Sequence, residues 1–320
     1  MKRFLMITVA VAPLALAGSA VSAADTFVRM ISGPSGGSWY PYGAKMMAMV
    51  GKKVKNVSAS SGPGAGVGNV RNINKKKAEF GWTFAHTAFN AYSGKSKFKS
   101  PHTNLRFFAN LYSAPLQTAV PANSKIRSYR DLKDKRISPG KLTFSGNIAV
   151  EKLMALYGVT YADIKKSGGN IHRVGYKDSV ALMKDGHIDA FVGLTTAPNS
   201  SFIALAFKPG VRFLPVSNNI ADLYIKQNPG FNKSVIRKGT YSGLNEDVLT
   251  VGAQNILITH KDVSNTIAYE VAKVIWENHA ELVKLNDYWK NVKLSAALQS
   301  SAFPVHPGAM RFYREKGIAK

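Results

Sequence analysis

The sequence predicts an α/β fold with two lobes joined by crossing strands. Segments rich in β-branched and apolar residues alternate with segments of helical period, which is the pattern of βαβ units and a largely parallel sheet. Hydrophobic residues make up 45% of the chain, which is enough for one large domain or for two lobes with cores of their own. Neither an internal repeat of about 20 to 50 residues nor a low-complexity linker divides the chain. This favours two lobes built from one continuous chain.

Residues 1–24 have the pattern of a secretory signal peptide, with two basic residues, an apolar run, and small residues before a cleavage site near Ala23 or Ala24. No later segment approaches the roughly 20 apolar residues of a membrane span. The sequence contains no cysteine, which excludes disulfides, metal sites with cysteine ligands and a lipid attached at a cysteine. We expect an exported, periplasmic protein.

The elements of the first part follow one another as strand and helix. Strands are expected over 26–32, 54–60 and 79–84, with helices over 40–50 and 66–76 between them. In the helix over 40–50, one face carries Tyr42, Met46, Met49 and Val50. Two further strands, over 105–112 and 115–121, are divided by a bend, and the second is expected to cross to the other lobe.

The second part repeats the same pattern. Strands are expected over 188–194, 211–216 and 249–260, and helices over 146–157 and 177–184. Ser264 is expected to cap a helix that runs to about 283, and the segment 217–249 has no clear assignment. The expected divisions are the signal peptide 1–24, the first lobe 25–117, the second lobe 118–215, and a return to the first lobe with C-terminal helices over 216–320.

The charge of the chain is strongly positive. Lys and Arg number 43 against 18 Asp and Glu, for a formal net charge of +25. The basic residues are dispersed and lack interleaved aromatic residues, so nucleic acid is not an expected partner. A solvated basic surface and the attraction of a small anion both remain open interpretations.

Motifs for catalysis or cofactors are weak. Gly33, Ser35 and Gly37 match the G-x-S-x-G of a hydrolase nucleophile elbow, but no earlier loop exists to supply an oxyanion donor. The glycines of the segment 62–68 do not fit G-x-G-x-x-G, and the histidines show no H-x-x-x-H pair. We therefore expect neither an enzyme nor a cofactor nor a metal site.

Two loops predict an anion site instead. The glycine-rich loop 33–38 leads from a strand into a helix, and Phe144-Ser145-Gly146-Asn147 opens another helix in the other lobe. The first N–H groups of a helix lack partners and carry partial positive charge, which favours an anion. Two such helix ends facing each other across a cleft would hold a small carboxylate.

The motifs "GPSGGSWYPYG", "VRNINKKKAEFGWTF", "SGNIAVEKLM" and "HPGAMRFYREKG", in this order, resemble the TAXI family. Its members are the solute receptors of one class of tripartite ATP-independent periplasmic (TRAP) transporters. The resemblance covers nearly the whole chain after the signal peptide. It implies a type II periplasmic-binding-protein fold, a ligand cleft at the hinge between the lobes, and a membrane permease of the TRAP type as partner. A monomer is expected.

The resemblance also implies which residues line the cleft. They are Gly36, Gly37, Ser38, Trp39, Tyr40, Ser61 and Gly62 in the first lobe and Ser145, Gly146, Asn147, Thr195 and Thr196 in the second. Thr195 and Thr196 follow a buried strand, at the end where open α/β sheets bind ligands.

Two features depart from the family. Phe84 stands where the family usually has a polar residue, and the loop before Ser145 is longer. We therefore expect a more apolar cleft, for a carboxylate with an aromatic or aliphatic body against Trp39, Tyr40, Trp82 or Phe84.

Three alternatives remain. The chain could be a receptor for an ATP-driven importer or a sensor, a secreted serine hydrolase that uses Ser35, or a basic protein that adheres to polyanions.

Overall fold

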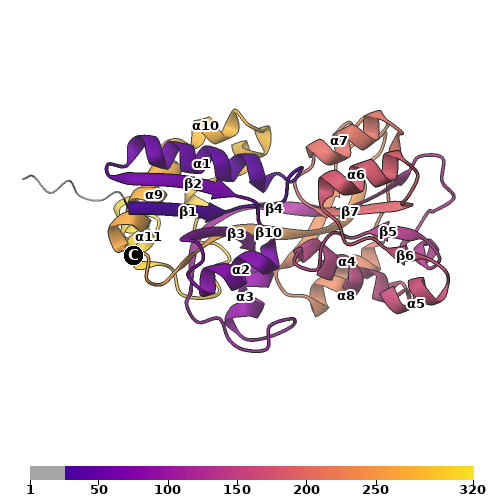
Figure 1. Cartoon of the computed structure of the whole chain (residues 1–320), viewed down its shortest axis with the longest axis horizontal. Coiled ribbons are helices and arrows are strands. Elements are labelled where there is room, and N and C mark those ends of the chain that lie inside the picture. Colours follow the sequence, from indigo (N-terminus) through magenta and orange to yellow (C-terminus); the bar gives the residue numbers. More distant parts are fainter. Residues whose placement is uncertain (1–25) are drawn as a thin grey trace, which may run out of the picture.

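A computed structural model describes residues 26–320; the predicted signal peptide lies outside the described residues. The chain forms two α/β lobes that lie side by side (Figure 1). The long strands β4 (Leu105–Pro121) and β10 (Val248–His260) run through the junction between them. The predicted two-lobed α/β fold with crossing strands is confirmed.

The strands form one twisted sheet in the order β2-β1-β3-β10-β4-β7-β5-β6, with β8 on β4 and β9 on β10. β1 is parallel to β2 and β3, and β5 is parallel to β6 and β7. In contrast, β10 runs antiparallel to β3, β4 and β9, and β4 runs antiparallel to β7 and β8. The remaining strands are β1 (Thr26–Ile31), β2 (Val57–Gly62), β3 (Phe80–Phe84), β5 (Arg136–Ser138), β6 (Asn170–Ile171), β7 (Ala190–Leu194), β8 (Val211–Phe213) and β9 (Phe231–Ile236).

Helices cover both faces of the sheet in each lobe (Figure 1). In the first lobe α1 lies on one face and α2 and α3 on the other; in the second lobe α6 and α7 lie opposite α4, α5 and α8. The helices are α1 (Trp39–Lys53), α2 (Gly66–Asn74), α3 (Ala85–Tyr92), α4 (Ser145–Leu156), α5 (Tyr161–Lys166), α6 (Tyr176–Lys184), α7 (Ser200–Phe207), α8 (Asn218–Gln227), α9 (Asn265–Glu277), α10 (His279–Val283) and α11 (Pro307–Glu315).

The predicted apolar face of α1 is confirmed, because Tyr42, Met46, Met49 and Val50 are all buried against the first lobe's sheet. The helical spacing of these residues places them on one side of α1, where their burial offsets the entropy of ordering the helix.

The predicted bend between residues 112 and 115 does not divide the strand. β4 is continuous over Leu105–Pro121, pairing with β10 up to Pro115 and with β7 from Leu116 onward. One strand thus joins the parts of the sheet in the two lobes, and the local irregularity appears only as shifts of register against β10. The proline fits because the strand changes partner there, so its missing N–H interrupts no regular ladder.

The predicted helix from Ser264 to about 283 is divided in two. Ser264 caps α9, its hydroxyl accepting a hydrogen bond from Ile267 N at 3.2 Å, as expected. The helix ends at Asn278, whose Nδ2 donates to Val274 O at 2.8 Å, and α10 follows. An asparagine that bonds its own backbone competes with helix continuation.

The segment 217–249 contains α8 and β9. Ile236, Tyr241 and Leu244 then pack into the apolar cluster of the second lobe with Phe191 and Phe202. The chain returns to the first lobe along β10. The predicted boundaries between the lobes stay predictions.

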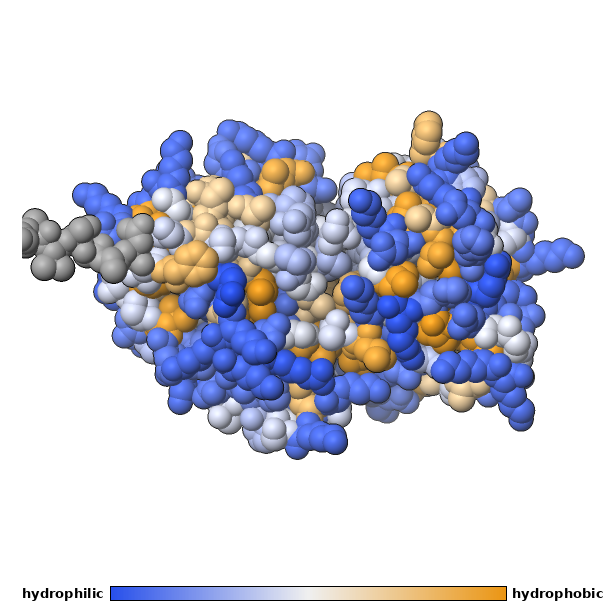
Figure 2. Space-filling view, viewed as in Figure 1, coloured by the Kyte–Doolittle hydropathy of each residue, from blue (hydrophilic) through white to orange (hydrophobic). Residues whose placement is uncertain are grey.

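Hydrophilic side chains cover most of the face shown in Figure 2, over both lobes. Within residues 26–320, no helix is long and apolar enough to cross a membrane. The same residues hold no cluster of three His, Asp or Glu side chains suited to a metal ion.

Candidate ligand-binding site

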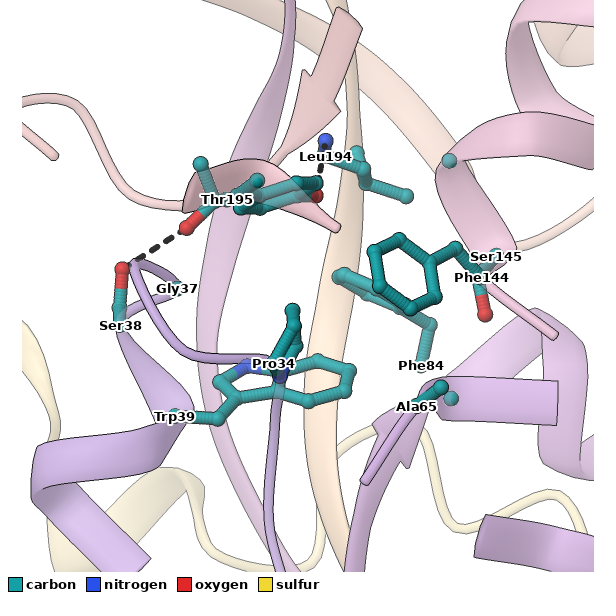
Figure 3. A pocket seen from close by; sticks show the side chains of 13 residues that line it. Pro34, Gly37, Ser38, Trp39, Ala65, Phe84, Phe144, Ser145, Leu194 and Thr195 are labelled. Atoms are coloured by element: carbon teal, nitrogen blue, oxygen red, sulfur yellow. Dashed lines mark hydrogen bonds between the residues drawn. The ribbon is translucent and has the colours of Figure 1, made fainter. Parts of the chain in front are cut away.

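A small cavity lies at the junction of the two lobes (Figure 3). Trp39 and Phe84 border it from the first lobe, and Phe144, Ser145 and Thr195 from the second. Its volume is about 30 Å³, room for about two water molecules. The two lobes therefore contact each other directly in this structure, which is a closed arrangement.

Four helices begin at this cavity. Trp39, Gly66, Ser145 and Tyr176 are the first residues of α1, α2, α4 and α6, and all four line it. The first N–H groups of each helix lack intrahelical partners, and the macrodipole gives each end partial positive charge. Two of these helices belong to each lobe, so closure brings four positive helix ends together.

A buried asparagine explains how the first lobe forms its side of the site. Asn69 of α2 donates from Nδ2 to Ser32 O and Trp82 O, both at 2.7 Å, and its Oδ1 accepts from Ala65 N at 2.9 Å. One side chain thus ties the ends of β1 and β3 to the start of α2. Because these strands are parallel, their carboxyl ends meet at one edge of the sheet, facing the second lobe.

Hydrogen bonds between uncharged groups hold the two lobes together. Ser38 Oγ lies 2.8 Å from Thr195 Oγ1 (Figure 3) and also contacts Thr196 Oγ1. The carbonyl of Gly36 accepts from Asn199 Nδ2 at 3.0 Å and from Ser201 Oγ at 3.1 Å. The loop at the start of α1 therefore binds the turn that follows β7.

A buried glutamine of β4 holds this turn in place. Gln117 Nε2 donates to the carbonyls of Thr195 and Thr196, at 3.1 and 2.9 Å. Its Oε1 accepts from Tyr241 OH at 2.6 Å, and that hydroxyl accepts from Asn199 N at 3.1 Å. Gln117 thereby fixes the position of Thr195 although it does not line the cavity.

Aromatic rings form much of the wall. The rings of Trp39 and Phe84 lie 4.8 Å apart, and those of Phe144 and Tyr176 lie 5.5 Å apart. Trp39 is held by a hydrogen bond from Nε1 to Asn255 Oδ1 at 2.6 Å. Burial raises the pKa of Tyr176, so its hydroxyl stays neutral, and it accepts from Leu194 N at 3.2 Å.

Among residues 26–320, no charged side chain lines this cavity. Its polarity comes from hydroxyl groups and from helix ends, while aromatic rings supply apolar surface. Such a site suits a ligand with one anionic group and a compact apolar body, since the backbone N–H groups can meet the charge without a buried counter-ion.

The predicted site residues divide into two groups. Gly37, Ser38, Trp39, Phe84, Ser145, Gly146 and Thr195 line the cavity. The others lie outside it: Gly36 and Thr196 in the contact between the lobes, Asn147 in a bond to Gly140 O, Ser61 and Gly62 at the end of β2, and Tyr40 with a side chain 43% exposed.

Sequence reasoning missed six lining residues. They are Pro34, Ala65, Gly66, Phe144, Tyr176 and Leu194. Gly66 is the first residue of α2, and Phe144 directly precedes α4. Their place at the start of a helix could have indicated that they line the cavity. Tyr176 gave none, because only the packing of α6 against β7 brings its ring to the junction.

Ser35 lies exposed on the loop before α1, beside a second hollow bordered by Lys141, Lys177 and Asp178. In the part of the chain that the structure describes, no histidine lines that hollow, and Ser35 Oγ makes no hydrogen bond to its lysine or aspartate side chains. A serine nucleophile needs an adjacent general base, so the geometry gives the hydrolase alternative no support.

Two α/β lobes joined by long strands, with a cavity where the lobes meet, define a fold of the periplasmic-binding-protein type. The chain belongs to the NMT1-like family, whose model matches residues 30–317.

Solved structures share this fold. The alkanesulfonate-binding protein SsuA from Xanthomonas axonopodis pv. citri, bound to MOPS, is 14% identical with a TM-score of 0.50, over 92% of this chain and 85% of that one. The aliphatic sulphonate-binding protein SsuA from Escherichia coli is 14% identical with a TM-score of 0.47, over 91% and 87%. At this level of identity the likeness shows the fold of the chain.

Proposed function

We propose that the chain is a periplasmic receptor that captures a small organic anion, foremost a carboxylate, by closing its two lobes. The supporting observation is the convergence of the N-termini of α1, α2, α4 and α6 on one cavity. The net charge of +25 supports it as well, because a positive surface accelerates the encounter with anions.

The lobes separate to admit the ligand, because the closed cavity of about 30 Å³ is too small for an organic molecule. The anionic group then meets the N–H groups at the helix ends, and the apolar body lies against Trp39, Phe84 and Phe144. As the lobes close over the ligand, the hydroxyl groups of Ser38 and Thr195, which bond each other in this structure, face the ligand. Of the predicted residues outside the cavity, Gly36 and Thr196 act by joining the lobes.

We further propose that residues 1–24 direct export of the chain and that the receptor, as a monomer, delivers its ligand to a TRAP-type permease. Its support is the resemblance of the motifs around Gly36 and His306 to the TAXI family. In reconstituted vesicles, uptake of the ligand is expected to require an ion gradient and not ATP. ATP-dependent uptake would assign the receptor to an ATP-driven importer.

The binding step is tested by thermal unfolding of the ligand-stripped protein with amino acids, dicarboxylates, 2-oxo acids and aromatic carboxylates. A ligand that binds only the folded form adds about 2.7 kcal/mol of stability at a hundredfold excess over its dissociation constant. We expect a dose-dependent rise for one acid and none for its amide.

Thr195→Val keeps the shape of the side chain and removes the hydroxyl that meets Ser38. It is expected to weaken binding about tenfold, the effect of losing roughly one hydrogen bond. Thr103→Val, at an exposed position before β4, is the matched control. If no carboxylate stabilises the protein, or if both variants bind alike, the proposed anion site is wrong.

A further inference from the structure

A second and larger cavity lies between the lobes, next to the first. Helices α2 and α3 border it on one side, and α4, α8 and the start of β9 on the other. Its volume is about 430 Å³, within the range of about 300 to 1,000 Å³ that small-molecule sites occupy. The two cavities share Ser145. Ligand-sized space is therefore present here even with the lobes closed.

The rim of this cavity is positively charged. Lys95 of the first lobe and Lys152 of the second line it, and within the described chain no acidic side chain does. Lys152 Nζ donates to Asn228 Oδ1 at 2.7 Å, which fixes the position of the ammonium group. Burial and the charge of Lys97 lower the pKa of Lys152, so an anion at this rim would relieve an unfavourable positive field.

The floor carries polar groups with spare hydrogen-bonding capacity. Thr87 Oγ1 lies 3.0 Å from Ser145 Oγ, across the lobes, and 3.0 Å from His86 Nε2. The other ring nitrogen, His86 Nδ1, is buried and has no hydrogen-bond partner among the described residues. A buried polar atom without a partner is unfavourable, and a ligand oxygen would supply the missing hydrogen bond.

The walls are aromatic and come from both lobes. Phe89 and Phe98 stand on the side of the first lobe, and Tyr224 and Phe231 on the side of the second. The His86 ring lies 4.2 Å from the ring of Phe231. These side chains offer flat apolar surface to a ligand body of aromatic or alkyl character.

We propose that this cavity is a second ligand-binding site, for an organic monoanion with an aromatic or alkyl body. The anionic group binds at Lys152 and the polar floor, and the body lies between the phenylalanine rings. Because the walls belong to both lobes, a ligand here stabilises the closed arrangement. The proposal for this second site rests on the residues that line it and does not depend on what the cavity beside Thr195 binds.

The probe is phenylacetate, with phenylacetamide as its neutral counterpart. Calorimetry is expected to show saturable binding of phenylacetate and at least tenfold weaker binding of the amide. In protein labelled with 15N in the histidine rings, the His86 signals are expected to shift along the same binding curve. Absence of saturable binding would overturn the proposal.

Variants separate this site from the cavity of the proposed function. Lys152→Met keeps the aliphatic stem and is expected to weaken phenylacetate binding at least tenfold, as is Lys95→Met to a smaller extent. Lys166→Met, at an exposed position on α5, is the matched control for lost charge. Thr195→Val, which affects this site only through closure of the lobes, is expected to weaken phenylacetate binding much less than Lys152→Met does.

The opposite pattern would overturn the second site. If Thr195→Val abolishes phenylacetate binding while Lys152→Met has no effect, the anion occupies the cavity of the proposed function alone. Conversely, if Lys152→Met weakens phenylacetate binding as expected but Thr195→Val weakens the binding of no carboxylate, the proposed function is contradicted and the second site remains supported.

Discussion

Single neutral side chains join the two lobes at the central cavity. Ser38 meets Thr195, and Ser145 meets Thr87, each pair through hydroxyl groups about the length of an ordinary hydrogen bond apart. Such contacts add modest free energy individually, which suits the proposed function, in which the lobes must also separate. Charged residues stand at the rim of the neighbouring cavity instead, as Lys152 does.

His86 gives a prediction for stability in acid. Burial, and to a lesser extent the charge of Lys152, lowers its pKa to about 3, whereas the unfolded chain takes up that proton near pH 6.5. Stability is therefore lost as the pH falls from about 6.5 toward 3, by at most about 1.4 kcal/mol per pH unit. His86→Phe keeps an aromatic ring beside Phe231 and removes the titration.

We expect His86→Phe to lose about 2 kcal/mol less than the natural chain between pH 6 and pH 4, measured by urea unfolding. His187→Phe, at an exposed turn after α6, is the control and should follow the natural chain. Parallel losses in His86→Phe and the natural chain would show that His86 is not buried in its neutral form.

At the scale of elements, strand ends and helix starts build the cavity, and β4 connects them. Gln117 of β4 reaches the turn after β7 through two carbonyls and reaches Tyr241 through its own oxygen. The strand that carries both lobes thus also positions Thr195. A change within β4 is expected to disturb the site without touching a ligand.

Gln117→Leu leaves two carbonyls and the Tyr241 hydroxyl without their buried partner, so we expect a loss of about 3 kcal/mol of unfolding free energy. Tyr241→Phe removes one hydroxyl and is expected to cost about 1 to 2 kcal/mol. Because the residues share one network, the double variant should cost less than the sum. Additive losses in chemical denaturation would contradict this coupling.

At the scale of the whole molecule, closure requires a very close approach of the lobes. A Cβ added at Gly66, the first residue of α2, would lie against Ser145 Oγ of the other lobe, closer than ordinary contact allows. The next residue, Val67, donates its N–H across the junction to Thr143 O at 3.1 Å. Exchange of that amide hydrogen therefore reports on closure.

Gly66→Ala is expected to speed exchange of the Val67 amide about tenfold, the effect of about 1.4 kcal/mol of lost closure. The Asn69 amide, bonded to Ala65 O within its own lobe at 2.7 Å, should keep its rate. Gly68→Ala is the matched control, since its Cβ would meet Thr143 at 3.7 Å, an ordinary contact. An unchanged exchange rate of the Val67 amide in Gly66→Ala would show that the Ser145 side chain moves aside without loss of closure free energy.

Removal of the Ser145 hydroxyl should restore closure. In Gly66→Ala combined with Ser145→Ala, the atom nearest to the added Cβ is absent, and Val67 protection is expected to recover. Failure to recover would place the obstruction elsewhere in the junction.

Local sequence patterns determined the elements of this protein. The helical spacing of Tyr42 and Met46, the capping serine Ser264 and the alternation of strands with helices all carry information within a few residues. The glycine-rich loop before Trp39 and the start of α4 at Ser145 likewise predicted helix ends that line the central cavity. Such features follow from the backbone preferences of individual residues and from the spacing of apolar residues, so they can be predicted from the sequence alone.

The tertiary structure alone decided which residues meet. Tyr176 and Gln117 reach the site through packing between segments far apart in sequence, and Tyr40, next to a lining residue, points to solvent. The cavity at His86 and Lys152 exists only because two lobes close on each other. Contacts of this kind depend on the relative position of whole layers, which no local period encodes.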